Sequence, residues 1–128
     1  SKIVAEVPFV DVLSTMSDPT IPLTVNEWDE WGNPADADDY AAMRAYSPYD
    51  NLRAGVRYPA LLVTGGLNDS RVGFWEPTKW VQALRFRNPD NEVYLKMEMG
   101  AGHGGPSGRY DTWRDEAGTL AFILDQIN

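Results

Sequence analysis

Two kinds of hydrophobic pattern recur along the chain: short apolar runs and longer stretches with helical spacing. The apolar runs are rich in β-branched residues and lie at Lys2–Val12, Tyr58–Gly66 and Asn91–Met99. The second run is apolar without interruption, which is typical of a strand that is buried on both faces of a parallel sheet. We predict three β-strands from these runs.

Helical patterns fill the stretches between and after the predicted strands. They lie at Ala35–Tyr46, Glu76–Arg87 and Arg109–Ile127. The first stretch begins with acidic residues, which stabilise a helix N-terminus, and the other two place large apolar side chains along one helical face. Strands that alternate with helices predict an α/β fold built on a parallel sheet.

Three strands make a narrow parallel sheet, and its first strand would present an open edge. The chain also begins almost directly on this strand. We therefore interpret it as the second half of a larger domain. Because parallel sheets bind ligands at the carboxyl ends of their strands, we expect functional residues in the loops that follow the strands.

Composition and charge narrow the classes of function. The chain has 128 residues, 43% of them hydrophobic, which is enough for a real core and makes one domain the default expectation. Its net charge of −8 disfavours nucleic acid and anionic membrane surfaces as partners and favours cationic ligands. The chain shows no long apolar run and no signal-peptide pattern, and it has no cysteine. We expect a cytoplasmic protein with no membrane partner.

The loop after the third predicted strand holds the only histidine, His103, in the glycine-rich stretch GAGHGGPSG. Glycines on both sides permit sharp turns with positive φ and give the ring close access to a neighbour. A metal held by this histidine would need carboxylates for every other ligand, so we predict no metal site and no cofactor. His103 is then either an ordinary loop residue or a catalytic base.

The loop after the second predicted strand contains Asp69, in the stretch LNDSR. Taken alone, Asp69 is a common type of turn residue. An acid after one strand and a histidine after the next match the last two members of the Ser–Asp–His order in α/β-hydrolases. Asp69 would then orient the ring of His103, which would accept the proton of a serine hydroxyl. No serine of this sequence lies in a G-x-S-x-G elbow, so we expect the nucleophile upstream of Ser1.

Long stretches of the sequence carry a resemblance to a known family. They are VPFVDVLSTMSDPTIPLTVNEWDEWGNP, YSPYDNL, YPALLVTGGLNDSRVGFWEPTKWVQALR and GAGHGG. These stretches strongly resemble the C-terminal end of the catalytic domain in the oligopeptidase B group of the prolyl oligopeptidase family of serine peptidases. The resemblance implies an α/β-hydrolase fold in which Asp69 and His103 match the triad acid and base. It also implies that the serine, the oxyanion-hole tyrosine and a β-propeller domain precede this chain.

The same resemblance implies a binding pocket for a basic side chain. Glu27 and Asp29 flank Trp28 and would point the same way in an extended segment. They match the two acids that hold a P1 Arg or Lys in oligopeptidase B, although the second acid is usually Glu. Two carboxylates grip a guanidinium with geometric selectivity, which predicts cleavage of short peptides after Arg or Lys. Arg71 matches an arginine that contacts the substrate backbone in prolyl-specific relatives, and a surface cation is the equal alternative.

Two hypotheses from different classes follow. In the first, the chain is the C-terminal segment of a serine oligopeptidase, completed by an upstream part that carries the serine. In the second, it is a non-catalytic acidic domain that binds cationic peptides. The pair of Glu27 and Asp29 argues against a third class, an esterase or acylaminoacyl-peptidase. Without its nucleophile the chain by itself is expected to be inactive, because loss of the triad serine costs on the order of 10⁶-fold in kcat in subtilisin.

Overall fold

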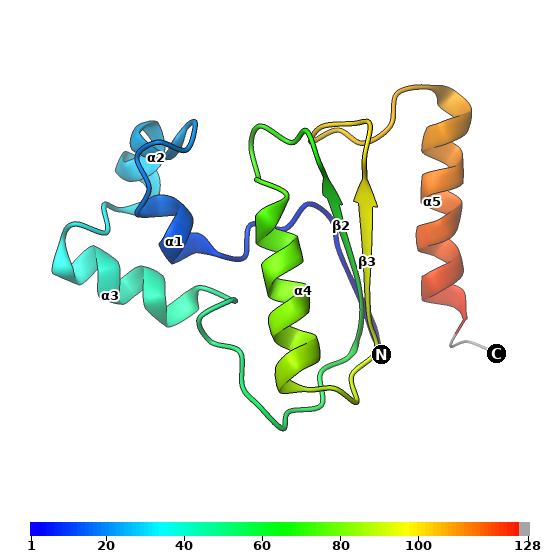
Figure 1. The fold of residues 1–128 in the computed structure, drawn as a ribbon, viewed down its shortest axis with the longest axis horizontal. Helices are drawn as coiled ribbons and strands as arrows, with labels where there is room; N and C mark the ends of the chain where they lie inside the picture. Colours follow the sequence, from blue (N-terminus) through cyan, green and yellow to red (C-terminus); the bar gives the residue numbers. More distant parts are fainter. Residues whose placement is uncertain (126–128) are drawn as a thin grey trace.

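The computed structural model describes residues 1–125 and shows a parallel sheet between two helices, with a separate helical lobe on one side (Figure 1). In chain order the elements are β1 (Lys2–Ala5), α1 (Val12–Met16), α2 (Thr24–Trp31), α3 (Ala37–Tyr46), β2 (Ala60–Gly66), α4 (Trp75–Arg87), β3 (Val93–Glu98) and α5 (Arg109–Leu124). The predicted α/β class and the parallel sheet are confirmed.

β2 is the central strand of the sheet, whose order is β1-β2-β3. It pairs in parallel with both neighbours, and most of its side chains are buried, which explains its continuous apolar run. The register places Gly66 opposite Glu98 at the carboxyl ends of β2 and β3. The two loops that carry Asp69 and His103 therefore start side by side.

The first strand is shorter than the sequence predicts. β1 ends at Ala5, because Val7 has a φ of 39° and its N–H donates to Thr64 Oγ1 at 3.3 Å instead of continuing a ladder. Pro8 follows and has no N–H to donate. Val10 and Val12, beyond Pro8, are buried, but outside the sheet. The predicted extent of Lys2–Val12 was wrong because an apolar run does not distinguish a strand from another buried segment.

Helix α2 lies in a segment for which the sequence predicts no helix. Its N-cap, Leu23, has a φ of 74° and offers no capping side chain, so the usual start signal is missing. Contacts to α1 hold the helix in place instead. Thr24 Oγ1 donates to the carbonyl oxygen of Thr15 at 3.2 Å, and Trp28 Nε1 donates to the carbonyl oxygen of Met16 at 3.0 Å. Tertiary packing decides the conformation here.

The other predicted helices agree closely with the structure. α3 begins after Asp36, whose side chain accepts hydrogen bonds from the N–H groups of Asp38 and Asp39, as the acidic start predicts. α4 begins one residue earlier than predicted. α5 is described to Leu124, and its predicted end at Ile127 lies outside the described residues. No helix within residues 1–125 is long and apolar enough to cross a membrane.

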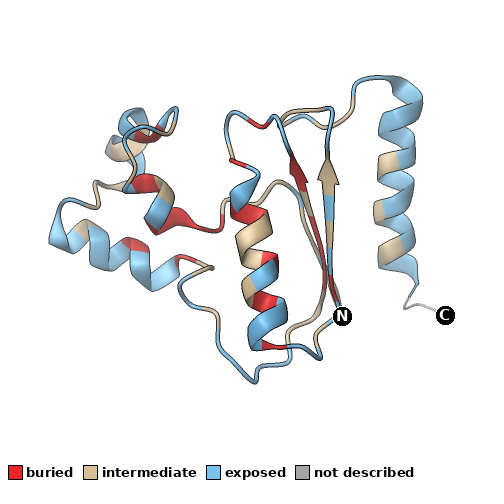
Figure 2. Cartoon of the chain, viewed as in Figure 1, coloured by how far each residue is buried: buried red, intermediate tan, exposed pale blue. Residues whose placement is uncertain are grey.

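Two separate clusters of buried side chains form the core (Figure 2). The cluster between α4 and the sheet consists of Leu61, Val63, Val81, Leu84 and Val93. The cluster that joins α1 to α3 consists of Val12, Leu13, Met16 and Met43. Full burial of a side chain of this kind contributes about 1.5–3 kcal/mol. The first cluster fixes α4 against the sheet, and the second fixes α1 against α3.

Candidate active site

Asp69 and His103 meet beyond the carboxyl ends of β2 and β3. His103 Nδ1 lies 2.8 Å from Asp69 Oδ2, although the two residues are 34 positions apart. The side chain of Asp69 is fully buried, whereas that of His103 is 35% exposed. The buried acid thus holds one ring nitrogen, while the partly exposed ring stays accessible to a reactant. The structure brings together the two residues that the sequence pairs.

The two oxygens of Asp69 have different partners. Oδ2 faces His103, and Oδ1 accepts hydrogen bonds from the N–H groups of Arg71 at 2.8 Å and Val72 at 2.9 Å. Burial alone would raise the pKa of Asp69, but these backbone N–H groups and the contact with His103 outweigh it and lower the pKa below 3.8. Asp69 is therefore an anion at neutral pH, as the orienting acid of a histidine must be.

Two glycines allow the histidine loop to pack on the acid loop. A β-carbon on Gly66 would lie 2.8 Å from the carbonyl oxygen of Gly102, and one on Gly102 would lie 3.1 Å from the carbonyl oxygen of Asn68. The first distance is shorter than real β-carbons show, and at the second the neighbouring backbone would have to shift by a few tenths of an ångström. The positive φ expected near His103 occurs at Gly105, where φ is 73°. Gly102 thus serves close approach, whereas Gly105 serves the turn.

A hollow of about 460 Å³ opens beside His103, between α1, α2 and the acid loop. Its lining residues are Phe9, Thr15, Met16, Pro22, Leu23, Thr24, Glu27, Trp31, Arg71, Val72 and His103. The rings of Phe9 and Trp31 meet edge to face at 5.3 Å and form an apolar wall. The structure therefore gathers Glu27, Arg71 and His103 around one space.

Asp29 does not share the position of Glu27. Both residues lie on α2, and two positions along a helix rotate a side chain by about 200°, so the two carboxylates diverge. Glu27 is half-buried and lines the hollow, whereas Asp29 is exposed and does not line it in the described part of the chain. The extended geometry predicted for this pair was wrong because the segment is helical.

Glu76 is a residue that sequence reasoning missed. It is 1% exposed, and it accepts hydrogen bonds from the N–H groups of Val10 and Asp11 and from the hydroxyl of Thr15. Burial raises the pKa of Glu76 above its ordinary 4.5. An acid in the first turn of a helix usually indicates only a favourable helix dipole. The sequence therefore offered no signal that this carboxylate is buried.

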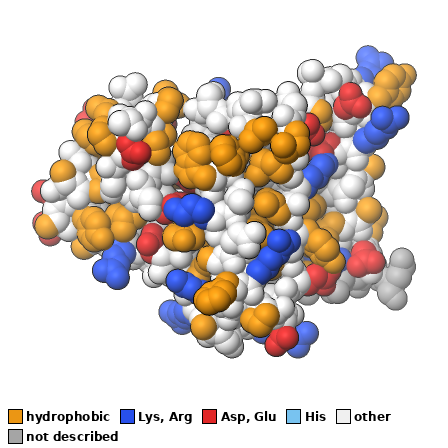
Figure 3. Space-filling model, viewed as in Figure 1, with side chains coloured by type: hydrophobic (Ala, Val, Ile, Leu, Met, Phe, Trp, Pro, Cys, Tyr) orange, Lys and Arg blue, Asp and Glu red, His pale blue; other side chains and the backbone are white. Residues whose placement is uncertain are grey.

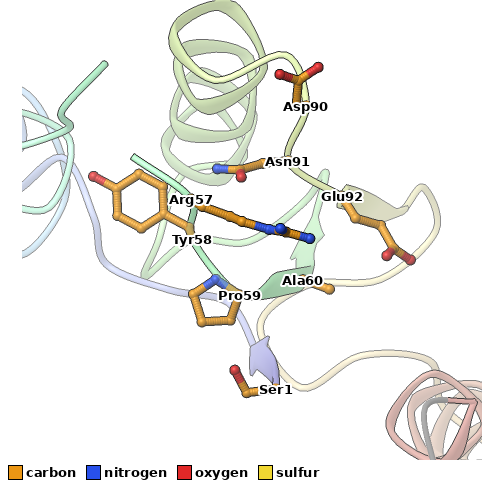
Figure 4. A pocket seen from close by; sticks show the side chains of 8 residues that line it. All are labelled: Ser1, Arg57, Tyr58, Pro59, Ala60, Asp90, Asn91 and Glu92. Carbon is orange, nitrogen blue, oxygen red and sulfur yellow. The ribbon is translucent and has the colours of Figure 1, made fainter. Parts of the chain in front are cut away.

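A second hollow, of about 430 Å³, lies at the opposite end of the sheet. It is bordered by Ser1 and by residues that precede β2 and β3, and Figure 4 shows the side chain of Arg57 extended across it. Because parallel sheets bind ligands at the carboxyl ends of their strands, the hollow at His103 is the better candidate site. Within residues 1–125, no group of three or more His, Asp or Glu side chains could hold a metal ion.

A parallel sheet flanked by helices, with an acid and a histidine in the loops at its carboxyl edge, is the architecture of an α/β-hydrolase. Comparison with solved structures gives the same fold. Oligopeptidase B from Leishmania major superposes with a TM-score of 0.93 at 47% identity, over 97% of this chain and 17% of that one. Oligopeptidase B from Trypanosoma brucei, with covalently bound antipain, superposes with a TM-score of 0.91 at 50% identity, over 95% and 17%.

Sequence comparison identifies the family. The whole chain, residues 1–128, matches the Prolyl oligopeptidase family. Protease 2 of Moraxella lacunata is 52% identical over 98% of this chain and 18% of its own length. Dipeptidyl aminopeptidase BI of Pseudoxanthomonas mexicana is 54% identical over 94% and 17%. The chain belongs to the prolyl oligopeptidase family of peptidases, as its sequence motifs imply, and spans less than a fifth of these relatives' length.

Proposed function

We propose that the chain is the C-terminal segment of an oligopeptidase B-like serine endopeptidase that cleaves short peptides after Arg or Lys. The observation that carries this proposal is the meeting of the Asp69–His103 pair and Glu27 around one hollow. Asp69 holds the proton on Nδ1 of His103, so Nε2 takes the proton of a serine hydroxyl and later donates it to the leaving amine. The anionic Asp69 also stabilises the imidazolium formed in between.

The serine comes from sequence outside this chain in our proposal. Within the described residues β1 pairs only with β2, which leaves its outer edge open to a further strand. Glu6 and Val7, directly after β1, border a space that also touches His103. A strand added at this edge would therefore end beside the histidine. The Trypanosoma brucei relative carries covalently bound antipain, which agrees with a nucleophile in that protein.

We assign the direct contact with the basic P1 side chain to Glu27, because it lines the hollow that His103 also lines. Asp29 is exposed and lies outside the residues that line the hollow, so it contributes only negative electrostatic potential to the binding of a cation. Arg71 contacts the substrate backbone in this proposal. It lines the same hollow, and no ion pair joins it to an acid among residues 1–125, which disfavours the alternative of a surface cation pair.

Glu27→Gln in a full-length peptidase that carries this chain tests the proposal. The substrates are two peptides that differ only at P1, one with Arg and one with its neutral analogue citrulline. Loss of a charge-assisted hydrogen bond is expected to lower kcat/KM for the Arg peptide by about 10- to 150-fold. The citrulline peptide should change little, and Asp29→Asn should have a smaller effect than Glu27→Gln.

The matched control is Glu30→Gln, which removes an exposed acid from the same helix. It should leave both substrates unaffected. An equal loss on the Arg and citrulline peptides in Glu27→Gln would contradict the pocket assignment. A full-length protein that binds the Arg peptide without cleaving it would instead support the second hypothesis, a non-catalytic domain for cationic peptides.

A further inference from the structure

A buried carboxylate links two parts of the molecule that border the candidate site. Glu76 Oε2 accepts hydrogen bonds from Val10 N at 2.8 Å and Asp11 N at 3.1 Å, and Glu76 Oε1 accepts one from the hydroxyl of Thr15. All three donors lie in α1 or in the segment that leads into it, whereas Glu76 lies in the first turn of α4. One side chain therefore ties α1 to α4.

α1 in turn holds the helix that carries Glu27. The carbonyl oxygen of Thr15 accepts a hydrogen bond from Thr24 Oγ1, and the carbonyl oxygen of Met16 accepts one from Trp28 Nε1. Thr15 and Met16 also line the hollow beside Glu27. The position of Glu27 thus depends on α1, and the position of α1 depends on Glu76.

The opposite wall of the hollow is connected to Glu76 through its own segment of chain. Asp69 fixes the turn that follows it by accepting the N–H groups of Arg71 and Val72. The N–H of Glu76 then donates to the carbonyl oxygen of Gly73 at 2.9 Å, at the start of α4. Glu76 and Asp69, the acid that faces His103, therefore lie on the same short segment of the chain.

The charges around Glu76 indicate a role other than adding to the free energy of unfolding. Asp11, whose negative charge also raises the pKa of Glu76, is 1% exposed and pairs with Lys79, which also lies 4.7 Å from the ring centre of Tyr49. One cation thus accompanies two buried carboxylates. Burial disfavours the ionised form of Glu76 and raises its pKa. Buried charges of this kind add little to stability, and their best-attested use is to fix one arrangement of packed elements.

We propose that Glu76 is a positioning residue that fixes the Glu27 wall of the hollow relative to the Asp69–His103 pair and thereby sets selectivity for the P1 side chain. Glu76 acts through α1 and α2 and touches no substrate. This inference rests on the proposed function, because selectivity for a basic side chain has a meaning only in a peptidase whose pocket contains Glu27.

Glu76→Ala and Glu76→Gln in the full-length peptidase test the inference. Alanine removes all three hydrogen bonds. Glutamine keeps an oxygen for the N–H groups of Val10 and Asp11, and its amide can donate to the oxygen of Thr15. The measured quantity is the ratio of kcat/KM for the Arg peptide to that for the citrulline peptide. Since a misplacement of about 1 Å costs on the order of 10²-fold, Glu76→Ala should lower this ratio at least tenfold, mainly through KM for the Arg peptide.

Glu76→Gln should restore most of the lost selectivity, and Thr15→Val should lower the ratio in the same direction by a smaller factor. Thr15→Val removes one donor only, so it keeps the inference testable if Glu76→Ala does not fold. An unchanged ratio in both Glu76→Ala and Thr15→Val, or in Thr15→Val alone where the alanine variant is not recovered, would overturn the positioning role.

Leu84→Ala is the matched control. Leu84 is 1% exposed in the cluster between α4 and the sheet, so its truncation weakens α4 without touching α1. The ratio should stay at its wild-type value, and a shift as large as that of Glu76→Ala would overturn the inference. A wild-type enzyme without preference for the Arg peptide overturns the proposed function itself. A wild-type preference that Glu27→Gln lowers and Glu76→Ala leaves intact overturns only the role of Glu76.

Discussion

Asp69 shows how one carboxylate can shape a turn and hold a histidine ring at the same time. Its Oδ1 atom organises the backbone of Arg71 and Val72, and its Oδ2 atom faces His103. The ordinary role of an aspartate in a turn and the role of an orienting acid, which look like alternatives in the sequence, are therefore compatible. The turn is what aims the second oxygen at the ring.

Asp69→Asn in the 128-residue chain tests the electrostatic part of this arrangement. The pKa of Asp69 is lower in the folded chain than its ordinary 3.8, so the ionised group stabilises the fold at higher pH. This contribution is lost as the pH falls through the folded pKa. Asparagine keeps an oxygen for the two backbone N–H groups but carries no charge.

The melting temperatures of wild type and Asp69→Asn should therefore differ most near neutral pH and converge in acid. Thermal unfolding followed by circular dichroism at a series of values from about pH 7 to about pH 2 gives the comparison. Asp50→Asn, which removes another acid that accepts a short-range hydrogen bond, serves as the control. A difference between wild type and Asp69→Asn that stays constant over the whole range would show that the charge of Asp69 contributes nothing.

Among the elements, β2 and α4 are those for which sequence and structure agree best. Their predicted bounds are nearly those observed. β1 and α2 do not agree. The end of β1 is decided by the backbone at Val7, and α2 is held by hydrogen bonds to α1. Where contacts between elements decide the conformation of a segment, its local hydrophobic pattern alone does not predict the element.

The contact between the histidine loop and the end of β2 gives a prediction at this scale. Gly66→Ala would place a β-carbon 2.8 Å from the carbonyl oxygen of Gly102, and because the obstacle is backbone, the histidine loop must move. We expect a loss of about 1–3 kcal/mol in the free energy of unfolding, as for other overpacked sites. Urea denaturation of the 128-residue chain measures this loss, and NMR of the His103 ring reports whether its contact with Asp69 survives.

Gly104→Ala is the control for this variant. Gly104 is the immediate neighbour of His103, yet a β-carbon there would meet no atom within 4 Å. Its stability and its ring resonances should resemble those of the wild type. Equal behaviour of the Gly66 and Gly104 variants would mean that close approach of the two loops does not position His103.

In the molecule as a whole, one face of the sheet is well covered and the other is thinly covered. α4 buries Val81 and Leu84 against the sheet, whereas no residue of α5 within Arg109–Leu124 is buried (Figure 2). Polar contacts help to hold α5, such as the donation from Lys2 Nζ to the carbonyl oxygen of Phe122 at 2.6 Å.

Hydrophobic side chains also gather on the surface over the start of α4 (Figure 3), where Phe74 and Trp75 are each 39% exposed. Exposed apolar surface of this kind is typical of contact with further protein.

A fluorophosphonate probe, which labels activated serines, tests the proposed division of the site between this chain and further sequence. The 128-residue chain should remain unlabelled, because no serine hydroxyl bonds to His103 within residues 1–125. A full-length peptidase that carries the chain should be labelled outside these residues, and His103→Ala should abolish that labelling. Mass spectrometry of the labelled protein locates the modified residue.

Two results would contradict this division. Labelling of any serine in the isolated chain would show that the nucleophile is present after all. Labelling of the full-length protein that persists in His103→Ala would remove His103 from the mechanism. Glu30→Gln, already used as a substrate-specificity control, should be labelled like the wild type.

The sequence alone determined the α/β class, the types of most elements, the order of Asp69 before His103 and the membership of a peptidase family. These properties follow from local periodicity, from turn residues and from contiguous motifs. Only the tertiary structure decided that Glu27 faces the hollow while Asp29 does not, and that Glu76 is buried against α1. The reason is physical: periodicity records which face of an element is buried, whereas contacts between distant elements depend on how those faces pack together.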